Sequence, residues 1–416
     1  MPNYEKIDKK VLDFVNEIEK DLTNYFYNIN KIEEYNFIKV LESFKKNKIE
    51  ESHFQESTGY GYTDIGRDKI EEVYKDVFHT EDALVRQQIV SGTHAISLAL
   101  FSITSFGDEI LSITGLPYDT LLSTIGINNE EGSLKEFGVK FNNIDLNDDG
   151  SFNIDLIKNS INVKTKVIYI QRSRGYSMRP ALSVLDIKKV IDEVKSINNK
   201  LIIIVDNCYG EFTDTIEPTD VGADIMCGSL IKNPGGGIVK SGGYIVGKKD
   251  LIRKCSIRLT APGIEKEVGV SFNQNRNVLE GLFLAPQIVS NVIKGSKLFI
   301  DAFTKLGFNV SPKSNEKQND IVVAIELKNK ELLNEFCNII QNVSPIDSFV
   351  KPYASHMPGY DSNIIMACGS FISGSSIELS CDGPEKEPYI VYFQGGLSYY
   401  HIKYALLNIL DGLELL

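Results

Sequence analysis

Short apolar runs alternate with amphipathic segments through most of the chain. Two of these runs, 167–171 and 201–206, are rich in β-branched residues, which is typical of strands buried on both faces of a parallel sheet. Between them, apolar residues recur at helical spacing over 184–197. The same alternation predicts further strands at 84–90, 109–114, 225–227 and 243–246, with a helix at 95–101. Repeated strand–helix–strand units predict an α/β domain with a mostly parallel sheet.

The two ends of the chain have a different pattern. Up to about residue 50, apolar positions at spacings of three and four predict helices, which we interpret as an N-terminal arm over 1–55 that packs on another subunit or on its own core. After a long helix near 281–294, short strands at 321–327 and 377–379 flank a helix at 331–343. This change predicts a large domain over 56–285 and a smaller α+β domain over 286–416.

Composition narrows the class of protein and its partners. The net charge of −12 argues against binding to nucleic acid or to anionic membranes. The first residues are polar, and no segment approaches the ~18 apolar residues of a membrane span. The six cysteines show no CxxC spacing, and the five histidines show no metal-binding spacing. We therefore expect a cytoplasmic protein without disulfides or a metal site.

Lys232 is the first candidate for chemistry. It lies between an apolar stretch and a Gly-rich turn, with no charged residue within seven positions on either side. A desolvated lysine of this kind has a lowered pKa and can act as a nucleophile that forms a Schiff base. The alternative is an ordinary loop lysine.

A possible phosphate site lies upstream. Ser91, Gly92 and Thr93 fall between a predicted strand and a predicted helix, where free backbone N–H groups and the positive end of the helix dipole favour an anion. Ser229, three residues before Lys232, could donate to the same phosphate. The alternative for the first group is simple capping of the helix by Ser91 or Thr93.

Two further side chains follow the ends of predicted strands, where ligands bind in open α/β sheets. Tyr118 could stack on a planar ring, or could pack its own loop. Asp206 ends the run LIIIVD and could hold a proton on a pyridine nitrogen, or could cap the next loop. With Lys232 and the phosphate site, these residues supply the four groups that pyridoxal 5′-phosphate (PLP) requires.

Several longer motifs resemble those of fold-type I PLP enzymes, in particular the cystathionine/methionine γ-lyase-like family and its "aluminium resistance" branch. They are STGYGYTDIGRDKIE (57–71), SGTHAISLAL (91–100), QRSRGYSMRP (171–180), VDNCYGEF (205–212), GSLIKNPGGGI (228–238) and GSSIELSCDGPEKEPYIVYFQGGL (374–397). The resemblance implies an aspartate aminotransferase-like large domain, PLP as cofactor, and a homodimer or homotetramer with shared active sites.

The resemblance also implies roles for individual residues. Lys232 would form the Schiff base and Asp206 would pair with the pyridinium nitrogen. Gly92, Thr93 and Ser229 would hold the phosphate, and Tyr118 would stack on the ring. From a neighbouring subunit, Tyr60 or Tyr62 together with Arg67 would reach the phosphate.

One departure from the related lyases concerns the substrate. Those enzymes bind the substrate α-carboxylate with an arginine of the small domain, but 369–382 contains none. Arg172 and Arg174, after the strand 167–171, are candidates because a guanidinium suits a carboxylate. Arg258 is a third. The alternative is that one of them makes a structural salt bridge.

The sequence thus predicts a PLP-dependent carbon–sulfur lyase that acts on a small-molecule sulfur amino acid of the cystathionine, cysteine or methionine class. Lys232 would anchor the cofactor and remove the α-proton, and Tyr118 and Asp206 would complete the catalytic set. Another PLP reaction, such as aldol cleavage or transamination, and a PLP-binding protein without turnover are the alternatives. No cluster of carboxylates suits a trivalent metal ion.

Overall fold

A seven-stranded sheet forms the centre of the large domain in the computed structural model, which describes residues 4, 6–357 and 362–416. In spatial order its strands are β1 (Asp82–Arg86), β7 (Gly243–Gly247), β6 (Ile225–Ser229), β5 (Ile202–Asp206), β4 (Thr165–Gln171), β2 (Glu109–Ser112) and β3 (Lys140–Asn143). Only β7 runs antiparallel to its neighbours. The prediction of an α/β domain with a mostly parallel sheet is confirmed.

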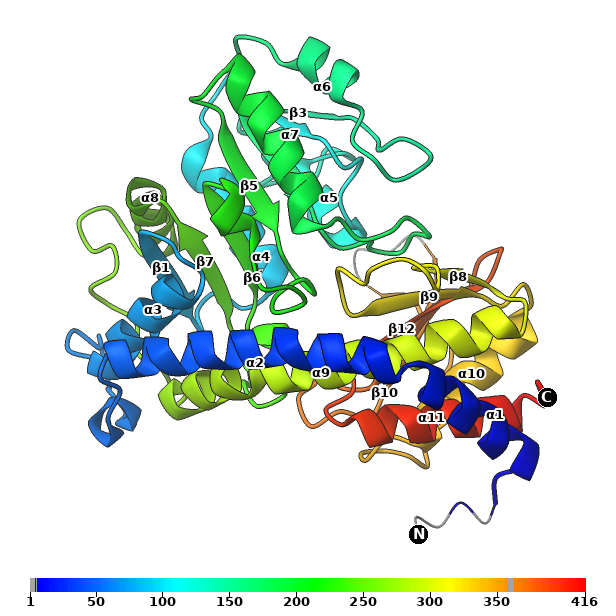
Figure 1. Ribbon diagram of the computed structural model, residues 1–416. Coiled ribbons are helices and arrows are strands. Elements are labelled where there is room, and N and C mark those ends of the chain that lie inside the picture. The colour runs from blue at the N-terminus through cyan, green and yellow to red at the C-terminus, as the bar shows by residue number, and fades with distance from the viewer. Residues whose placement is uncertain (1–3, 5, 358–361) are drawn as a thin grey trace.

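Helices cover both faces of this sheet (Figure 1). Successive side chains of a strand point to opposite faces. Accordingly, Val167 and Tyr169 of β4 pack with α4 (Gly92–Ile103) and α8 (Lys249–Leu259). Ile168 and Ile170 pack with the other layer, which contains α6 (Ile154–Ser160) and α7 (Val184–Ile197). Burial on both faces explains why these strands are continuously apolar in sequence.

The remaining elements of this half connect the layers. They are η1 (Glu51–Phe54), α3 (Ile65–Val77), α5 (Asp119–Ile125), η2 (Pro218–Val221) and η3 (Asn233–Gly235). Across the described residues, no helix combines the length and the apolarity needed to cross a bilayer.

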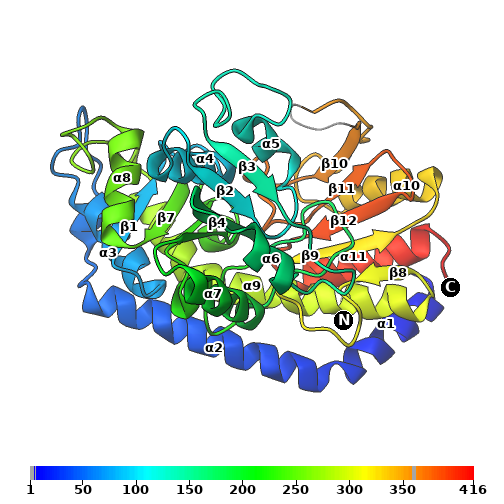
Figure 2. The same cartoon turned by 90° about the horizontal axis from the view of Figure 1, so that it is seen from above.

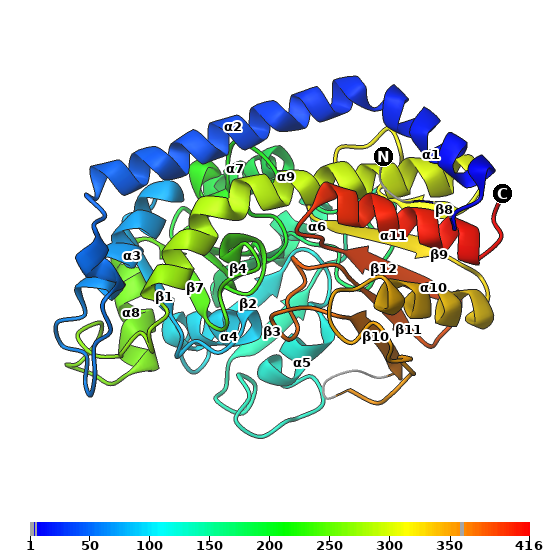
Figure 3. The ribbon, with the colours of Figure 1, turned by 90° about the horizontal axis from the view of Figure 1, so that it is seen from below.

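The N-terminal arm packs on its own chain. Helix α1 (Lys9–Asp21) buries Val11 and Val15 in the core of the small domain, and α2 (Thr23–Lys46) runs alongside α9 (Asn275–Lys305), as Figures 1 and 3 show. Both helices thus bury one face against their own chain, and contact of the arm with another subunit stays a prediction.

The domain boundary predicted near residue 285 is wrong in one respect, because it falls inside α9. This single helix contributes Val278 and Leu282 to the core beside the large sheet, and Leu298 and Phe303 to the core of the small domain. A helix that serves two cores shows one uninterrupted amphipathic pattern, so its sequence carries no boundary signal.

The small domain contains a five-stranded antiparallel sheet (Figure 2). Its strands in spatial order are β10 (Ile364–Cys368), β11 (Ser380–Pro384), β12 (Ile390–Gln394), β9 (Val322–Glu326) and β8 (Asn309–Ser311). Helices α10 (Lys330–Asn342), α11 (Tyr399–Gly412) and the second half of α9 pack against one face. The α+β character of this region is as predicted.

The strand predicted at 377–379 is wrong, because the chain turns there and β11 begins at Ser380. The carboxylate of Glu378 accepts hydrogen bonds from the backbone N–H groups of Phe371 (2.8 Å) and Ile372 (2.9 Å). Ile377 and Leu379 pack into two different cores. The alternation of Ile377, Glu378 and Leu379 has the pattern of a strand. In the structure the two apolar side chains instead fix a turn by packing into the cores on either side.

Candidate active site

The carboxyl ends of the parallel strands bring the predicted residues together. Asp206 ends β5, Ser229 ends β6, and Lys232 follows in the next turn. Gln171 ends β4, and its side-chain oxygen accepts a hydrogen bond from the backbone N–H of Tyr118 at 3.0 Å. Parallel strands end at one edge of a sheet, which explains how residues far apart in sequence meet there.

Asp206 is buried beneath this edge. Its carboxylate accepts hydrogen bonds from the backbone N–H of Cys208 (3.0 Å) and from the hydroxyl of Tyr169 (3.5 Å), both uncharged donors. Burial raises the pKa of the carboxyl, although the charge of Lys232 and these hydrogen bonds act in the opposite direction. Asp206 is therefore a desolvated carboxylate suited to a cationic partner.

The amine of Lys232 lies over an aromatic ring. Its Nζ is 3.9 Å from the ring centroid of Tyr209, which follows Asp206 in a tight turn and has a φ of 72°. Burial lowers the pKa of Lys232, but Cys208, Tyr209, Asp206 and Tyr118 raise it by more, so that it lies well above the ordinary value. The expected lowering of this pKa is wrong, because the same fold that buries the amine surrounds it with acidic groups.

A small-residue cradle begins α4. A Cβ atom added to Gly92 would lie 3.1 Å from Sγ of Cys208 and 3.4 Å from Cβ of Ser229, so Gly92 and Ser229 are direct neighbours and only glycine leaves this space open. Ser91 has the capping role considered in the sequence, since its hydroxyl accepts a hydrogen bond from the backbone N–H of His94 at 3.0 Å.

Tyr118 joins the cradle through its hydroxyl. This hydroxyl donates to Oγ1 of Thr93 at 3.0 Å, and Oγ1 of Thr93 lies 3.1 Å from Oγ1 of Thr120. Burial, reinforced by Asp206, raises the pKa of Tyr118 well above its ordinary value. Tyr118 is therefore a neutral phenol held between the cradle and the edge of the sheet.

These residues fit PLP. The helix N-terminus opened by Gly92 and the hydroxyls of Thr93 and Ser229 match a phosphate. The buried carboxylate of Asp206 lacks a charged hydrogen-bond donor, and Lys232 supplies an amine at the same sheet edge. These residues match three of the four functions that the cofactor needs, and Tyr118 beside the cradle is the candidate for the fourth, ring stacking.

Arg172 has a structural role. It is buried, forms an ion pair with Glu217 (3.5 Å), and is surrounded by oxygen acceptors. Its other partners are the backbone oxygens of Leu182 (3.3 Å) and Gly210 (2.9 Å), Oδ1 of Asn207 (2.8 Å) and Oγ1 of Thr213 (3.1 Å). The candidate role in substrate binding is therefore replaced by the alternative, a structural salt bridge that holds the loop after β5.

Replacing Arg172 with leucine should destabilise the fold by about 3–5 kcal/mol, because Glu217 would be left buried without its partner. Equilibrium denaturation in urea would measure the loss. Arg258→Leu is the matched control, and it should change the free energy of unfolding by less than about 1 kcal/mol because Arg258 is exposed. Unchanged stability in Arg172→Leu, with a raised KM for substrate, would restore the substrate-binding role.

The other two predicted arginines have contacts of their own, and a role in substrate binding stays a prediction for both. Arg174 is buried, donates to Oγ of Ser311 at 2.7 Å and pairs with Asp320 at 3.5 Å, so it links the large domain to the small one. The guanidinium of Arg258 lies 5.0 Å from the ring centroid of Phe101. Phe101 is about 14 Å along α4 from the cradle, at the helix end away from the site. The contacts of these two guanidinium groups are thus with the small domain for Arg174 and with the ring of Phe101 for Arg258.

The loop before α3 presents two tyrosines to solvent. Tyr60 is 72% exposed and Tyr62 62% exposed, with ring centroids 5.4 Å apart. Arg67 is buried, and its guanidinium donates to the backbone oxygens of Gly61 (2.7 Å) and Gly269 (3.1 Å). Arg67 thus fastens this loop to its own chain, and a reach of the tyrosines to a second subunit stays a prediction.

Two charged residues near the candidate site were not predicted from the sequence, although both lie in the motifs 171–180 and 374–397. Arg179 follows β4, and its guanidinium donates to the backbone oxygens of Gln171 (3.0 Å), Ser173 and Pro180 (3.1 Å). Burial lowers the pKa of Arg179 to about 10. Asp382 of β11 is the second. The sequence around Arg179 and Asp382 carries no signal that sets them apart. Only their positions in the folded chain show that they lie near the site.

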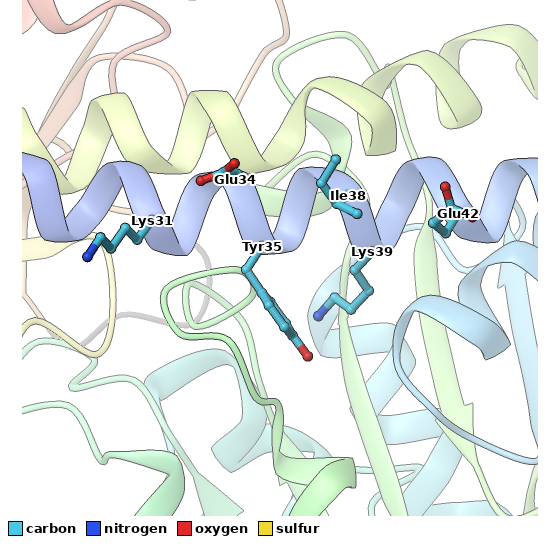
Figure 4. Close-up of a pocket in the computed structure, with 6 residues that line it drawn as sticks. All are labelled: Lys31, Glu34, Tyr35, Ile38, Lys39 and Glu42. Carbon is cyan, nitrogen blue, oxygen red and sulfur yellow. The ribbon is translucent and has the colours of Figure 1, made fainter.

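A separate hollow lies along α2 (Figure 4). Tyr35 and Lys39 point from the helix in the same direction, and Nζ of Lys39 lies 5.7 Å from the ring centroid of Phe212. Burial lowers the pKa of Lys39. The residues that line this hollow are Lys31, Glu34, Tyr35, Ile38, Lys39 and Glu42, and the candidate site shares none of them. In the part of the chain that the structure describes, no group of three His, Cys, Asp or Glu residues is arranged to hold a metal ion.

Two known proteins are similar to this chain over nearly its whole length. The Bacillus subtilis (strain 168) protein YnbB is 50% identical over 399 residues, which cover 95% of each chain. A crystal structure from Clostridium novyi NT, described as a carbon-sulfur lyase involved in aluminum resistance, superposes with a TM-score of 0.94 at 47% identity, covering 98% of this chain and 96% of that one.

More distant proteins share the fold alone. The pyridoxal-5′-phosphate dependent protein YhfS of Escherichia coli matches with a TM-score of 0.63 at 16% identity, over 92% of this chain and 96% of that one. The family model described as methionine gamma-lyase matches residues 11–414. With a match over nearly its whole length, the chain belongs to the methionine gamma-lyase family, in the branch linked with aluminium resistance.

Proposed function

We propose that the protein is a PLP-dependent carbon–sulfur lyase that acts on a sulfur amino acid and holds its cofactor covalently on Lys232. The observation that carries the proposal is the meeting of Lys232, Asp206 and the Gly92–Ser229 cradle at one edge of the sheet. The family of the chain and the name of the Clostridium novyi NT protein support the carbon–sulfur lyase class.

Each residue of the site would have one task. Gly92, Thr93 and Ser229 would hold the phosphate, and the carboxylate of Asp206 would keep a proton on the ring nitrogen. When bound, PLP supplies an electron sink for the pair of electrons left by loss of a substrate α-proton. Tyr118 would stack on the ring and, as a neutral phenol, exclude water from that side.

Lys232 would move the proton. Its Nζ, once free, would take the proton from the substrate α-carbon. The nearby carboxylate of Asp206, which raises the pKa of this amine, would stabilise its protonated form after the transfer. Loss of a thiol from the β- or γ-carbon, followed by hydrolysis, would release ammonia and a 2-oxo acid.

The purified protein, supplied with PLP, should release ammonia and pyruvate or 2-oxobutyrate from cystathionine, cysteine or methionine. Coupled steady-state assays for the oxo acid would measure this, and boiled enzyme with PLP provides the background rate. Absence of turnover with all three substrates contradicts the proposal. Aldehyde release from a β-hydroxy amino acid, or amino transfer to an oxo acid, would identify the alternative PLP reactions instead.

A further inference from the structure

One face of the small-domain sheet looks towards the candidate site. Asp382 is paired in register with Tyr392 on β12, so their side chains share a face, and Gln394 lies two residues further along on that same face. The opposite face, with Cys381 and Phe393, is buried against the helices of the small domain. The face that carries Asp382 is therefore the one turned to the large domain.

Aromatic rings connect this face to Lys232. The ring of Tyr392 lies 4.9 Å, centroid to centroid, from that of Tyr176, in the loop after β4. Tyr392, Tyr176 and Tyr209 belong to one apolar cluster, and Nζ of Lys232 lies over Tyr209 at 3.9 Å. Asp382 and Lys232 thus lie beside the same aromatic cluster, and Lys232 is near enough to act on the charge of Asp382.

Among the residues that the structure describes, the hydrogen-bond partners of the Asp382 carboxylate are uncharged. Nε2 of Gln394 donates to its Oδ2 at 3.2 Å, and the hydroxyl of Tyr176 forms a second hydrogen bond with it. Burial raises the pKa of this carboxyl to about 6, against the opposing effects of Tyr176, Gln394 and Lys232. At neutral pH Asp382 is therefore mostly ionised, and when Lys232 is engaged by the cofactor it would attract another cation.

We propose that Asp382 and Gln394 form a specificity subsite for a second ammonium group on the substrate, so that the preferred substrates are thioether amino acids with an amine at the far end of the leaving group. The inference rests on the proposed lyase function and names the substrate class for it. It also accounts for the lack of an arginine in 369–382, because the small domain would receive a cation there and not a carboxylate.

Electrostatics sets the size of the effect. At about 4 Å in a protein environment, opposite charges attract strongly enough to change binding by much more than tenfold, and like charges repel by a similar factor. Partial solvation of the site reduces this, so we expect roughly tenfold to hundredfold discrimination between substrates whose far ends differ only in charge.

Three cysteine thioethers of similar length provide the test, namely S-(2-aminoethyl)-, S-ethyl- and S-(carboxymethyl)-cysteine. Each would release pyruvate and ammonia, and they differ in the charge at the far end. The wild-type kcat/KM should fall about tenfold from the aminoethyl to the ethyl compound, and further for the carboxymethyl compound. The difference should lie mainly in KM, because the contact is made equally in ground and transition states.

Asp382→Asn should remove this dependence of kcat/KM on charge, since the amide keeps the shape of the carboxylate but not its charge. The rate with S-ethylcysteine should stay within about threefold of wild type. Glu385→Gln is the matched control, because Glu385 pairs with Lys330 at the surface of the same domain and should leave the order unchanged.

The outcomes separate the two proposals. Turnover of all three compounds at similar kcat/KM by the wild type overturns the subsite, and so does an unchanged order in Asp382→Asn, while the lyase function stands. If Asp382→Asn lowers kcat/KM by the same factor for all three compounds, Asp382 has only a structural role, and this result would also overturn the subsite. If the variant does not fold, the wild-type order alone decides. No turnover of any compound would count against the lyase function itself.

Discussion

Lys232→Ala should lose both covalently held PLP and lyase activity. Borohydride reduction of the wild type should trap PLP on the peptide that contains Lys232, and the variant should show no such adduct by mass spectrometry. The kcat should fall by at least about 10³-fold, because the covalent anchor and the proton-transfer group are the same amine. The absorbance band of the bound cofactor should disappear together with the adduct.

The structure indicates that this variant will fold. Lys232 and Asp206 influence each other's charge, so loss of the amine lets the Asp206 carboxyl take up a proton and leaves no isolated buried charge. Lys240→Ala is the control, because this exposed lysine eight residues later is outside the site. Trapping of PLP in Lys232→Ala at the wild-type stoichiometry would show that another amine holds the cofactor.

Asp206→Asn should separate cofactor binding from catalysis. The amide keeps the size of the side chain but removes the charge that would hold a proton on the ring nitrogen. An opposite charge at about 4 Å is worth about 4 kcal/mol at an effective dielectric constant of 20, so kcat should fall by roughly 10³-fold. Reductive trapping of PLP on Lys232 should persist, and KM should change by much less than kcat.

Glu211→Gln is the informative control for this variant. Glu211 is also buried, accepts a hydrogen bond from the hydroxyl of Tyr244 at 2.7 Å, and lies near enough to Lys232 to affect its charge. Burial raises the pKa of Glu211 to about 8, so it is already mostly neutral at pH 7 and its replacement by a neutral amide should change kcat little. If Asp206→Asn turns over as fast as Glu211→Gln, the assigned role of Asp206 is refuted.

The elements that could be predicted from the sequence are those whose signal is local. The strand 202–206 and the helix 184–197 carry their patterns within a few residues, because burial on both faces or on one helical face repeats along the segment. The run 377–379 shows the limit of such patterns, since three residues cannot distinguish a strand from a turn anchored by two side chains.

The candidate site was predictable in part for the same reason. Lys232, Asp206 and Tyr118 each follow a strand, and the topology of a parallel sheet brings strand ends together without further information. The pKa of Lys232 was not predictable, because it depends on Cys208 and Tyr209 as neighbours in space. The sequence shows that the residues flanking Lys232 are uncharged. It does not show which acidic side chains lie next to its amine in the folded protein.

The identity of their charged partners explains why the roles of Arg172, Arg174 and Asp382 could not be predicted from the sequence. Arg172 and Arg174 look alike in sequence, yet one pairs with Glu217 in its own domain and the other with Asp320, 146 residues away. Asp382 is an ordinary residue of a quoted motif until β11 places it opposite Tyr392 and near Lys232. The sequence by itself determined the cofactor-binding framework, because that framework depends on local strand ends. Only the tertiary structure decided which charges are compensated by a partner, because ion pairs form between segments that are far apart in the sequence.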